Sequence, residues 1–172
     1  RAGPSPWRRQ AARAAGDGRM RVGIDTRELM GRATGVGRYL GELLSAWSAP
    51  ASGVAGRHAF VLYGPAPLPA AVASRIAPLR AEVRVVPGSG GTVWEQVTLP
   101  SAAARDGLDV FFAPAYTAPL RMDCPVALTI HDLSYFAHPE WFAAREGLRR
   151  RLVTRLAAGR AVIVLTDTRF SQ

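Results

Sequence analysis

Apolar residues follow two alternating patterns from residue 21 onward. Short and nearly continuous apolar runs, typical of strands buried on both faces, alternate with stretches in which apolar residues recur every three or four positions, as on one face of a helix. The runs predict six strands, at residues 21–26, 59–63, 82–86, 108–112, 126–130 and 161–166. The helical spacing predicts helices at residues 36–47, 69–79, 93–105 and 145–158.

Strands that alternate with helices imply right-handed crossovers and a mostly parallel sheet with helices on both faces. We therefore predict an α/β fold, a Rossmann-like domain over residues 20–172. Pro100 lacks a backbone donor and should kink or split the helix at 93–105. Ligands of such sheets bind beyond the carboxyl ends of the strands, so the residues that follow each strand are the candidates for function.

The first 19 residues have a different composition. They mix Ala, Arg, Gly and Pro without an apolar segment, which predicts a disordered tail and no secretory signal. Met20 directly precedes the first strand and is the expected natural start. Residues 1–21 hold six of the 22 arginines and one acid, Asp17, in a chain of net charge +9. The absence of Lys and Asn from the sequence indicates the coding bias of a GC-rich genome, so the charge does not predict a nucleic-acid partner.

Hydrophobic residues make up 48% of the chain, as in globular proteins, and no run of about 18 apolar residues occurs. Cys124 is the single cysteine, so no internal disulfide can form, which fits a reducing cytoplasm. The helix at 145–158 mixes arginines with leucines, namely Arg145, Arg149, Arg150, Arg151 and Arg155 with Leu148, Leu152 and Leu156. This mixture favours a solvated helix flank over docking on a membrane surface.

Glycines dominate the loop between the first strand and the first helix. Gly35 and Gly37 permit close approach of the backbone to a ligand, and a helix that begins nearby points its N–H groups at an anion; a flexible loop is the alternative. A dinucleotide fingerprint would need glycine where Leu40 stands and a tight turn after Asp25. The second strand also ends without the acid that holds a ribose, so a nicotinamide-dependent dehydrogenase is disfavoured.

Polar side chains follow other strands as well. His131 and Asp132 come after the fifth strand, where an imidazole suits proton or hydrogen-bond work near neutral pH; the alternative is a histidine held structurally by the carboxylate beside it. Glu95, on the helix after the Gly-rich 89–91 segment, can approach the same crevice or act as a partner of the helix dipole. Tyr116 can stack on a sugar ring or fill its loop.

Five segments carry a family resemblance, and all lie within residues 20–172. In chain order they are RVGIDTRELMGRATGVGRYLGELL, GTVWEQVTLP, LDVFFAPAYTAPL, CPVALTIHDLSYFAHPEWF and AVIVLTDTRFSQ. Together they resemble the family 4 retaining glycosyltransferases, most closely the bacterial mannosyl- or rhamnosyltransferase-like members that build surface polysaccharides. The resemblance implies the amino-terminal, acceptor-side domain of a GT-B fold, in which two Rossmann-like domains face each other across a cleft.

The resemblance also implies roles for individual residues. His131 would be catalytic and lie beside the transferred sugar, and Asp132 would orient it or the adjoining loop. Donor and substrate binding would involve Gly35, Gly37, Arg38, Glu95, Tyr116 and Thr168. Thr168 replaces the usual serine of the family's T-D-S-E-F-S segment and keeps a hydroxyl, whereas Arg169 replaces the usual acid.

The implied activity is transfer of a mannose-like sugar from a nucleotide-diphosphate sugar to a glycan or lipid-linked acceptor, with no cofactor and no metal. It would take place in the cytoplasm or at the inner face of the membrane, with weak peripheral membrane contact. The family's carboxy-terminal domain, which holds the nucleotide and a Glu-x7-Glu motif, is absent from this sequence. Basic groups of that domain stabilise the leaving phosphate, so we expect the chain alone to be inactive. A non-catalytic Rossmann-like binding module is the alternative.

Overall fold

The sheet is parallel throughout and has the strand order β3-β2-β1-β4-β5-β6. The computed structural model describes residues 18–31 and 34–167. The strands are β1 (Arg21–Asp25), β2 (Ala59–Gly64), β3 (Glu82–Val85), β4 (Val110–Ala113), β5 (Val126–Ile130) and β6 (Ile163–Thr166). The predicted α/β, Rossmann-like fold is therefore confirmed.

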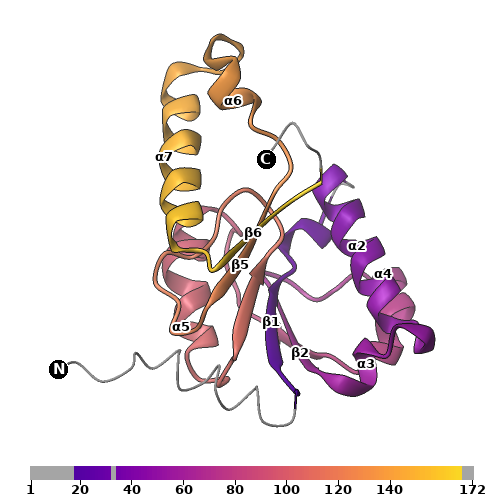
Figure 1. Ribbon diagram of the computed structural model, residues 1–172. Coiled ribbons are helices and arrows are strands. Elements are labelled where there is room, and N and C mark those ends of the chain that lie inside the picture. Colours follow the sequence, from indigo (N-terminus) through magenta and orange to yellow (C-terminus); the bar gives the residue numbers. More distant parts are fainter. Residues whose placement is uncertain (1–17, 32–33, 168–172) are drawn as a thin grey trace, which may run out of the picture.

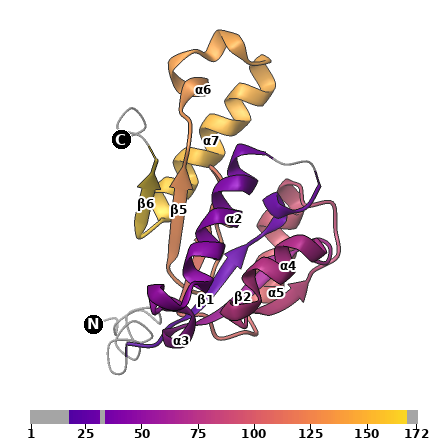
Figure 2. The same ribbon diagram turned by 90° about the vertical axis from the view of Figure 1, so that its right-hand side faces the viewer.

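Helices cover both faces of the sheet (Figure 1). They are α2 (Gly35–Ser48), α3 (Val54–Arg57), α4 (Ala70–Ile76), α5 (Leu99–Ala103), α6 (Ser134–Ala137) and α7 (Ala144–Arg160), and short 3-10 turns occur at Arg27–Leu29, Pro50–Ser52, Ala77–Leu79 and Pro139–Trp141. The helices α2, α3 and α4 lie on one side of the sheet, and α5 and α7 lie on the other (Figures 1 and 2). Among the described helices, none is both long and apolar enough to cross a bilayer.

Each face of the sheet has its own apolar core. On the α2 side, Leu40 and Leu44 pack with Ile24 of β1. On the other side, Leu99 of α5 and Ala157 of α7 belong to the core that includes residues of β4 and β5. The continuous apolar runs in the strands supply both cores, because alternate side chains of a strand point to opposite faces.

Pro100 does not split its helix: helical structure runs without a break over residues 92–103, and only the hydrogen-bond pattern changes just before the proline. Residues Trp94–Thr98 form a π-turn in which the Leu99 N–H donates to the Trp94 carbonyl, and α5 begins at Leu99 with the proline in its first turn. Such turns occur where the regular hydrogen-bond ladder is interrupted, and a proline cannot donate to it. The π-turn carries Trp94 and Glu95, and both side chains are buried.

The strand order places a topological switch point between β1 and β4. From β1 the chain builds the sheet outward through β2 to β3, and it then returns to add β4, β5 and β6 on the other side. Open α/β sheets bind their ligands in the crevice at such a point, outside the carboxyl ends of the strands. The segments that leave β1 and β4 are therefore the first place to look for a site.

Candidate functional site

A cleft of about 300 Å³ opens at this switch point. Its walls come from the turn after β1, the loop before the π-turn, the loop after β4, and the helices α6 and α7. The lining residues are mostly polar, namely Arg27, Glu28, Gly90, Gly91, Thr92, Glu95, Ala115, Tyr116, Thr117, Tyr135, Arg149, Arg150 and Thr154. A cleft with this lining can offer hydrogen bonds to a polyhydroxylated or charged ligand.

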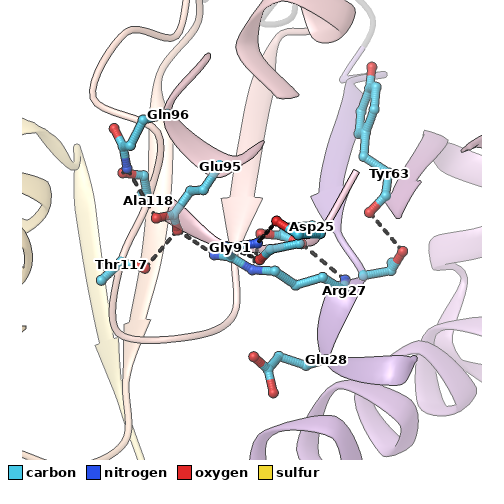
Figure 3. Close-up of polar contacts among 12 residues, drawn as sticks. Asp25, Arg27, Glu28, Tyr63, Gly91, Glu95, Gln96, Thr117 and Ala118 are labelled. Atoms are coloured by element: carbon cyan, nitrogen blue, oxygen red, sulfur yellow. Dashed lines mark hydrogen bonds and ion pairs between the residues drawn. The ribbon is translucent and has the colours of Figure 1, made fainter. Parts of the chain in front are cut away.

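A buried ion network of Asp25, Arg27 and Glu95 forms the floor of the cleft (Figure 3). The Arg27 Nε lies 3.0 Å from the Asp25 carboxylate, and its Nη2 is paired with the Glu95 carboxylate. The Arg27 Nη1 donates to the Gly90 carbonyl at 3.2 Å. The side chains of Asp25, Arg27 and Glu95 are 3%, 13% and 4% exposed, respectively. One guanidinium therefore ties the end of β1 to the segment 90–95, which is distant in sequence.

Burial and charge act in opposite directions in this network. Burial raises the pKa of Asp25 to about 6, although Arg27 opposes that shift. Burial disfavours the charge of Arg27, yet the neighbouring carboxylates of Asp25 and Glu95 outweigh it and raise the pKa of the guanidinium. Arg27 therefore stays charged and balances the carboxylates around it.

Glu95 also organises the loop after β4. The Thr117 hydroxyl donates to the Glu95 carboxylate at 2.6 Å. The Gln96 amide donates to the same carboxylate and to the Ala118 carbonyl, both at 3.0 Å, and its oxygen accepts the Leu120 N–H (Figure 3). Glu95 lines the cleft, as expected for a binding residue, but its contacts within the protein indicate a positioning role. The carboxylate of Glu95 is held by the side chains of Arg27, Gln96 and Thr117, so interaction with the helix dipole is not its main role.

Tyr116 forms part of the cleft wall in an unusual backbone conformation. Its φ is +40°, in the left-handed region that non-glycine residues rarely adopt, and its N–H donates to the Thr129 carbonyl at 3.0 Å. Its ring meets the His131 ring edge-on, with centroids 5.7 Å apart. Burial raises the pKa of its hydroxyl. The loop therefore holds an aromatic surface at the cleft, at a cost in backbone strain that often accompanies functional sites.

His131 lies between Tyr116 and Tyr39 of α2, whose ring centroid is 4.8 Å away. Its Nε2 faces the Pro114 carbonyl at 2.7 Å and its Nδ1 faces an Asp167 carboxylate oxygen at 3.1 Å. A carbonyl oxygen only accepts, so Nε2 carries a proton, and an ionised Asp167 accepts from Nδ1 when the ring is doubly protonated. His131 itself is not among the cleft-lining residues and reaches the cleft through Tyr116.

The carboxylate that holds His131 is that of Asp167, which follows β6, and not that of Asp132. Asp132 accepts the Ser134 N–H at 2.7 Å and the Ser134 hydroxyl at 2.5 Å. Of the two roles implied for Asp132, these contacts fit orientation of the adjoining loop, which leads into α6.

Gly35 and Gly37 have different local environments, which explain differently why glycine stands at each position. A Cβ on Gly37 would lie 2.3 Å from the Glu28 carbonyl oxygen, so glycine is required for the close packing of the Arg27–Leu29 turn against α2. Its N–H donates to the Thr34 hydroxyl, which caps the helix. Gly35 borders open space and leaves the helix start approachable.

Arg38 is exposed on the same first turn of α2, and the next residue, Tyr39, contacts His131. The structure thus brings the glycine-rich helix start and His131 together at one edge of the sheet. Thr168 lies outside the described residues.

The predicted set of site residues included Glu95 but missed its partners in the ion network, Asp25 and Arg27, and the far wall of the cleft. Asp25 ends β1 and Arg27 lies just after it, and this position at a strand end was the signal in the sequence. The pairing of Arg27 with Glu95, however, is a long-range contact. On the far wall, the Tyr135 hydroxyl lies 3.0 Å from the Thr154 hydroxyl. At the rim, Arg149 donates to Thr92 at 3.0 Å.

Within residues 18–31 and 34–167, no group of three or more His, Cys, Asp or Glu side chains is arranged to hold a metal ion. Comparison with protein-family models, with curated proteins and with solved structures gave no significant match. A functional assignment therefore depends on the site geometry and on the sequence resemblance.

Proposed function

We propose that this chain is the acceptor-side, Rossmann-like part of a retaining glycosyltransferase. The reaction would transfer a mannose-like sugar from a nucleotide-diphosphate sugar to a glycan or lipid-linked acceptor. The observation that carries the proposal is the meeting of three elements that the resemblance singles out: the Gly35–Gly37 helix start, His131 and Tyr116. They share the edge of the sheet at which the cleft opens.

In this proposal each element has a distinct task. The start of α2 attracts a phosphate through its helix dipole, and Gly35 leaves space for the approach. Tyr116 offers a ring for contact with a sugar face. His131 orients Tyr116 and the segments after β4 and β6 beside the transferred sugar, because its Nε2 donates to the Pro114 carbonyl and its Nδ1 faces the Asp167 carboxylate.

A non-catalytic carbohydrate-binding module is the second candidate. The ion network closes the floor of the cleft with groups of this chain alone, so the cleft exists without any other domain. A dehydrogenase gains no support, because the connection from β1 to α2 contains the Arg27–Leu29 turn and is longer than the tight dinucleotide turn.

The test is a donor screen on the polypeptide encoded by the complete reading frame, with GDP-mannose and other nucleotide-diphosphate sugars. We expect transfer, and a loss of about a hundredfold or more in His131→Ala. His58→Ala is the matched control, since His58 lies at the opposite end of β1, where it accepts the Met20 N–H and its ring meets Phe60 edge-on. Unchanged transfer in His131→Ala would remove the histidine from the proposal. A reading frame that encodes no second Rossmann-like domain would favour the binding module.

A further inference from the structure

The buried side of α7 carries an arginine where the helix passes the cleft. Gly147, Thr154 and Ala157 are buried, and their spacing places them on one side of the helix; Arg150 falls on the same side, between Gly147 and Thr154. The start of α7 projects with α6 beyond the carboxyl ends of the strands (Figures 1 and 2). Both Arg150 and Thr154 line the cleft. The outer face of the helix carries the exposed leucines Leu148, Leu152 and Leu156.

Two neighbouring arginines of α7 are held at the cleft by contacts with other segments. Arg149 lines the cleft beside Arg150 and donates to the Thr92 hydroxyl at 3.0 Å. The Arg150 guanidinium lies over the Phe142 ring, 5.8 Å from its centroid. The α7 wall of the cleft therefore presents two positive charges.

Hydroxyl groups lie close to these charges. Burial raises the pKa of the Tyr116 and Tyr135 hydroxyls, and the charge of Arg150 opposes both shifts, so its guanidinium acts on both phenols. The Tyr135 hydroxyl also lies 3.0 Å from the Thr154 hydroxyl. Such groups can donate to, and accept from, the hydroxyls of a sugar ring. The wall thus combines cations that suit an oxyanion with hydroxyls that suit a sugar.

The wall on the β1 side has the opposite charge. Glu28 lines it and accepts the Thr34 hydroxyl at 3.2 Å, at the start of α2. Between the walls, the charge of Arg27 is balanced by the carboxylates of the ion network. An oxyanion is therefore attracted to the α7 wall and repelled by Glu28, whereas a ligand hydroxyl can donate to the Glu28 carboxylate. The cleft is polarised to orient a ligand that has an anionic end and a hydroxyl end.

We infer that the acceptor is an acidic sugar, whose carboxylate or phosphate substituent lies against Arg149 and Arg150. A free hydroxyl of this sugar then points toward the start of α2, where the proposed function places the donor phosphate. A neutral sugar would lack the charge-assisted hydrogen bonds, which are about twice as strong as neutral ones. The role of this sugar as acceptor rests on the proposed function, but its binding can be measured without transfer.

Paired ligands that differ in one group test the preference for charge. The ligands are the methyl glycosides of glucuronic, galacturonic and mannuronic acid, each compared with its neutral parent sugar by calorimetric titration of the polypeptide encoded by the complete reading frame. At least one acid should bind about tenfold more tightly than its partner, and added salt should reduce the difference. The 6-phosphates of the same glycosides distinguish phosphate from carboxylate as the bound group. Equal binding of the charged and neutral members in every pair would overturn the inference.

Arg149→Gln with Arg150→Gln should weaken binding of the acidic sugar by about tenfold or more and leave binding of its neutral partner unchanged. A general loss of structure would weaken both. Arg145→Gln with Arg155→Gln is the matched control, because it removes the same charge from the same helix at positions that are not among the cleft-lining residues. The control should keep the preference. An equal loss in the control would mean that the net charge of α7, and not the cleft, selects the ligand, and the inference would fail.

Transfer assays separate this inference from the proposed function. Transfer to neutral acceptors with no gain for acidic ones would refute the acidic acceptor and leave the proposed function intact. Preferential binding of an acidic sugar, without transfer from any nucleotide-diphosphate sugar, would refute the proposed function and the acceptor role, while the site for acidic sugars would stand.

Discussion

Arginine serves opposite purposes at the switch point and on α7. Arg27 is buried, and its guanidinium meets two carboxylates and a backbone carbonyl. On α7, Arg151 and Arg155 lie beside the exposed leucines, and the Arg155 guanidinium lies over the Phe136 ring. The first arrangement fixes loops around a cleft, and the second leaves a basic, apolar surface facing outward.

This difference separates stability from binding. A buried charge is tolerated only when its partners are complete, so a change at Arg27 exposes the protein to the full penalty of unpaired carboxylates. A change on the outer face of α7 removes groups that already contact water and should leave the fold intact. The comparison therefore predicts large losses of stability at the switch point and small ones on α7.

The largest effect is expected from Arg27→Met. This change leaves Asp25 and Glu95 buried without their cation and should lower the free energy of unfolding by about 3–5 kcal/mol. Urea denaturation measures it. Arg75→Met is the control, because its pair with Glu42 is exposed and should contribute less than about 1 kcal/mol. Equal losses in the two variants would contradict the contrast.

A somewhat smaller effect is expected from pH, through Asp25. Its pKa in the folded protein is raised from 3.8 to about 6, so the folded state binds the proton more tightly than the unfolded state does. The favourable contribution of the protonated form is complete below about pH 4 and is lost as the pH rises through about 6. Between about pH 4 and pH 7, the free energy of unfolding of the unchanged protein should thus fall by about 2–3 kcal/mol relative to that of Asp25→Asn. A stability difference that stays constant from pH 4 to 7 would show that this carboxyl is not desolvated.

Gly37→Ala tests how firmly the turn that carries Arg27 is held against α2. The new Cβ would collide with the Glu28 carbonyl, which we expect to cost about 1–3 kcal/mol in thermal or urea unfolding. Gly35→Ala is the matched control, because its Cβ would enter open space, and it should change stability by no more than about 0.5 kcal/mol. Similar behaviour of the two variants would mean that the turn can move freely.

The smallest effect is expected on α7. Leu152→Ser should change the free energy of unfolding by less than about 0.5 kcal/mol, since the side chain is largely exposed. Leu128→Ala, at a fully buried position of β5, should cost about 2–5 kcal/mol. Thermal unfolding of both variants, followed by circular dichroism, measures the difference. A large loss of stability in Leu152→Ser would show that Leu152 is buried in a core.

The fold could be predicted from the sequence because periodicity reports burial directly. The strand at 126–130 and the start of α2 near residue 36 agree with the structure to within one residue. The strand predicted at 108–112 begins instead at Val110. Leu108 is buried but lies outside the strand, because an apolar side chain can be buried without its backbone pairing with a neighbouring strand. Pro100 predicted a local change in its helix, because a proline lacks the donor, but the outcome is a π-turn within a continuous helix and not a split.

The site could be predicted only in part, because its contacts are long-range. Strand ends identified His131 and Tyr116, but nothing local indicates that Asp167 holds the imidazole from the end of β6. An arginine normally lies at the surface, so the burial of Arg27 between two carboxylates could not be inferred from composition. On α7, a regular row of leucines resembles a core face, yet Thr154 and Ala157 occupy the buried side.

The most direct test of the sugar-transfer account is an NMR titration with GDP-mannose of the polypeptide encoded by the complete reading frame, followed through backbone amide shifts. The account predicts that the largest changes fall on Gly35 and Gly37 at the start of α2, on Tyr116 and on His131, with the helix α4 unaffected. Changes confined to other parts of the molecule, or no change at these four residues, would contradict it.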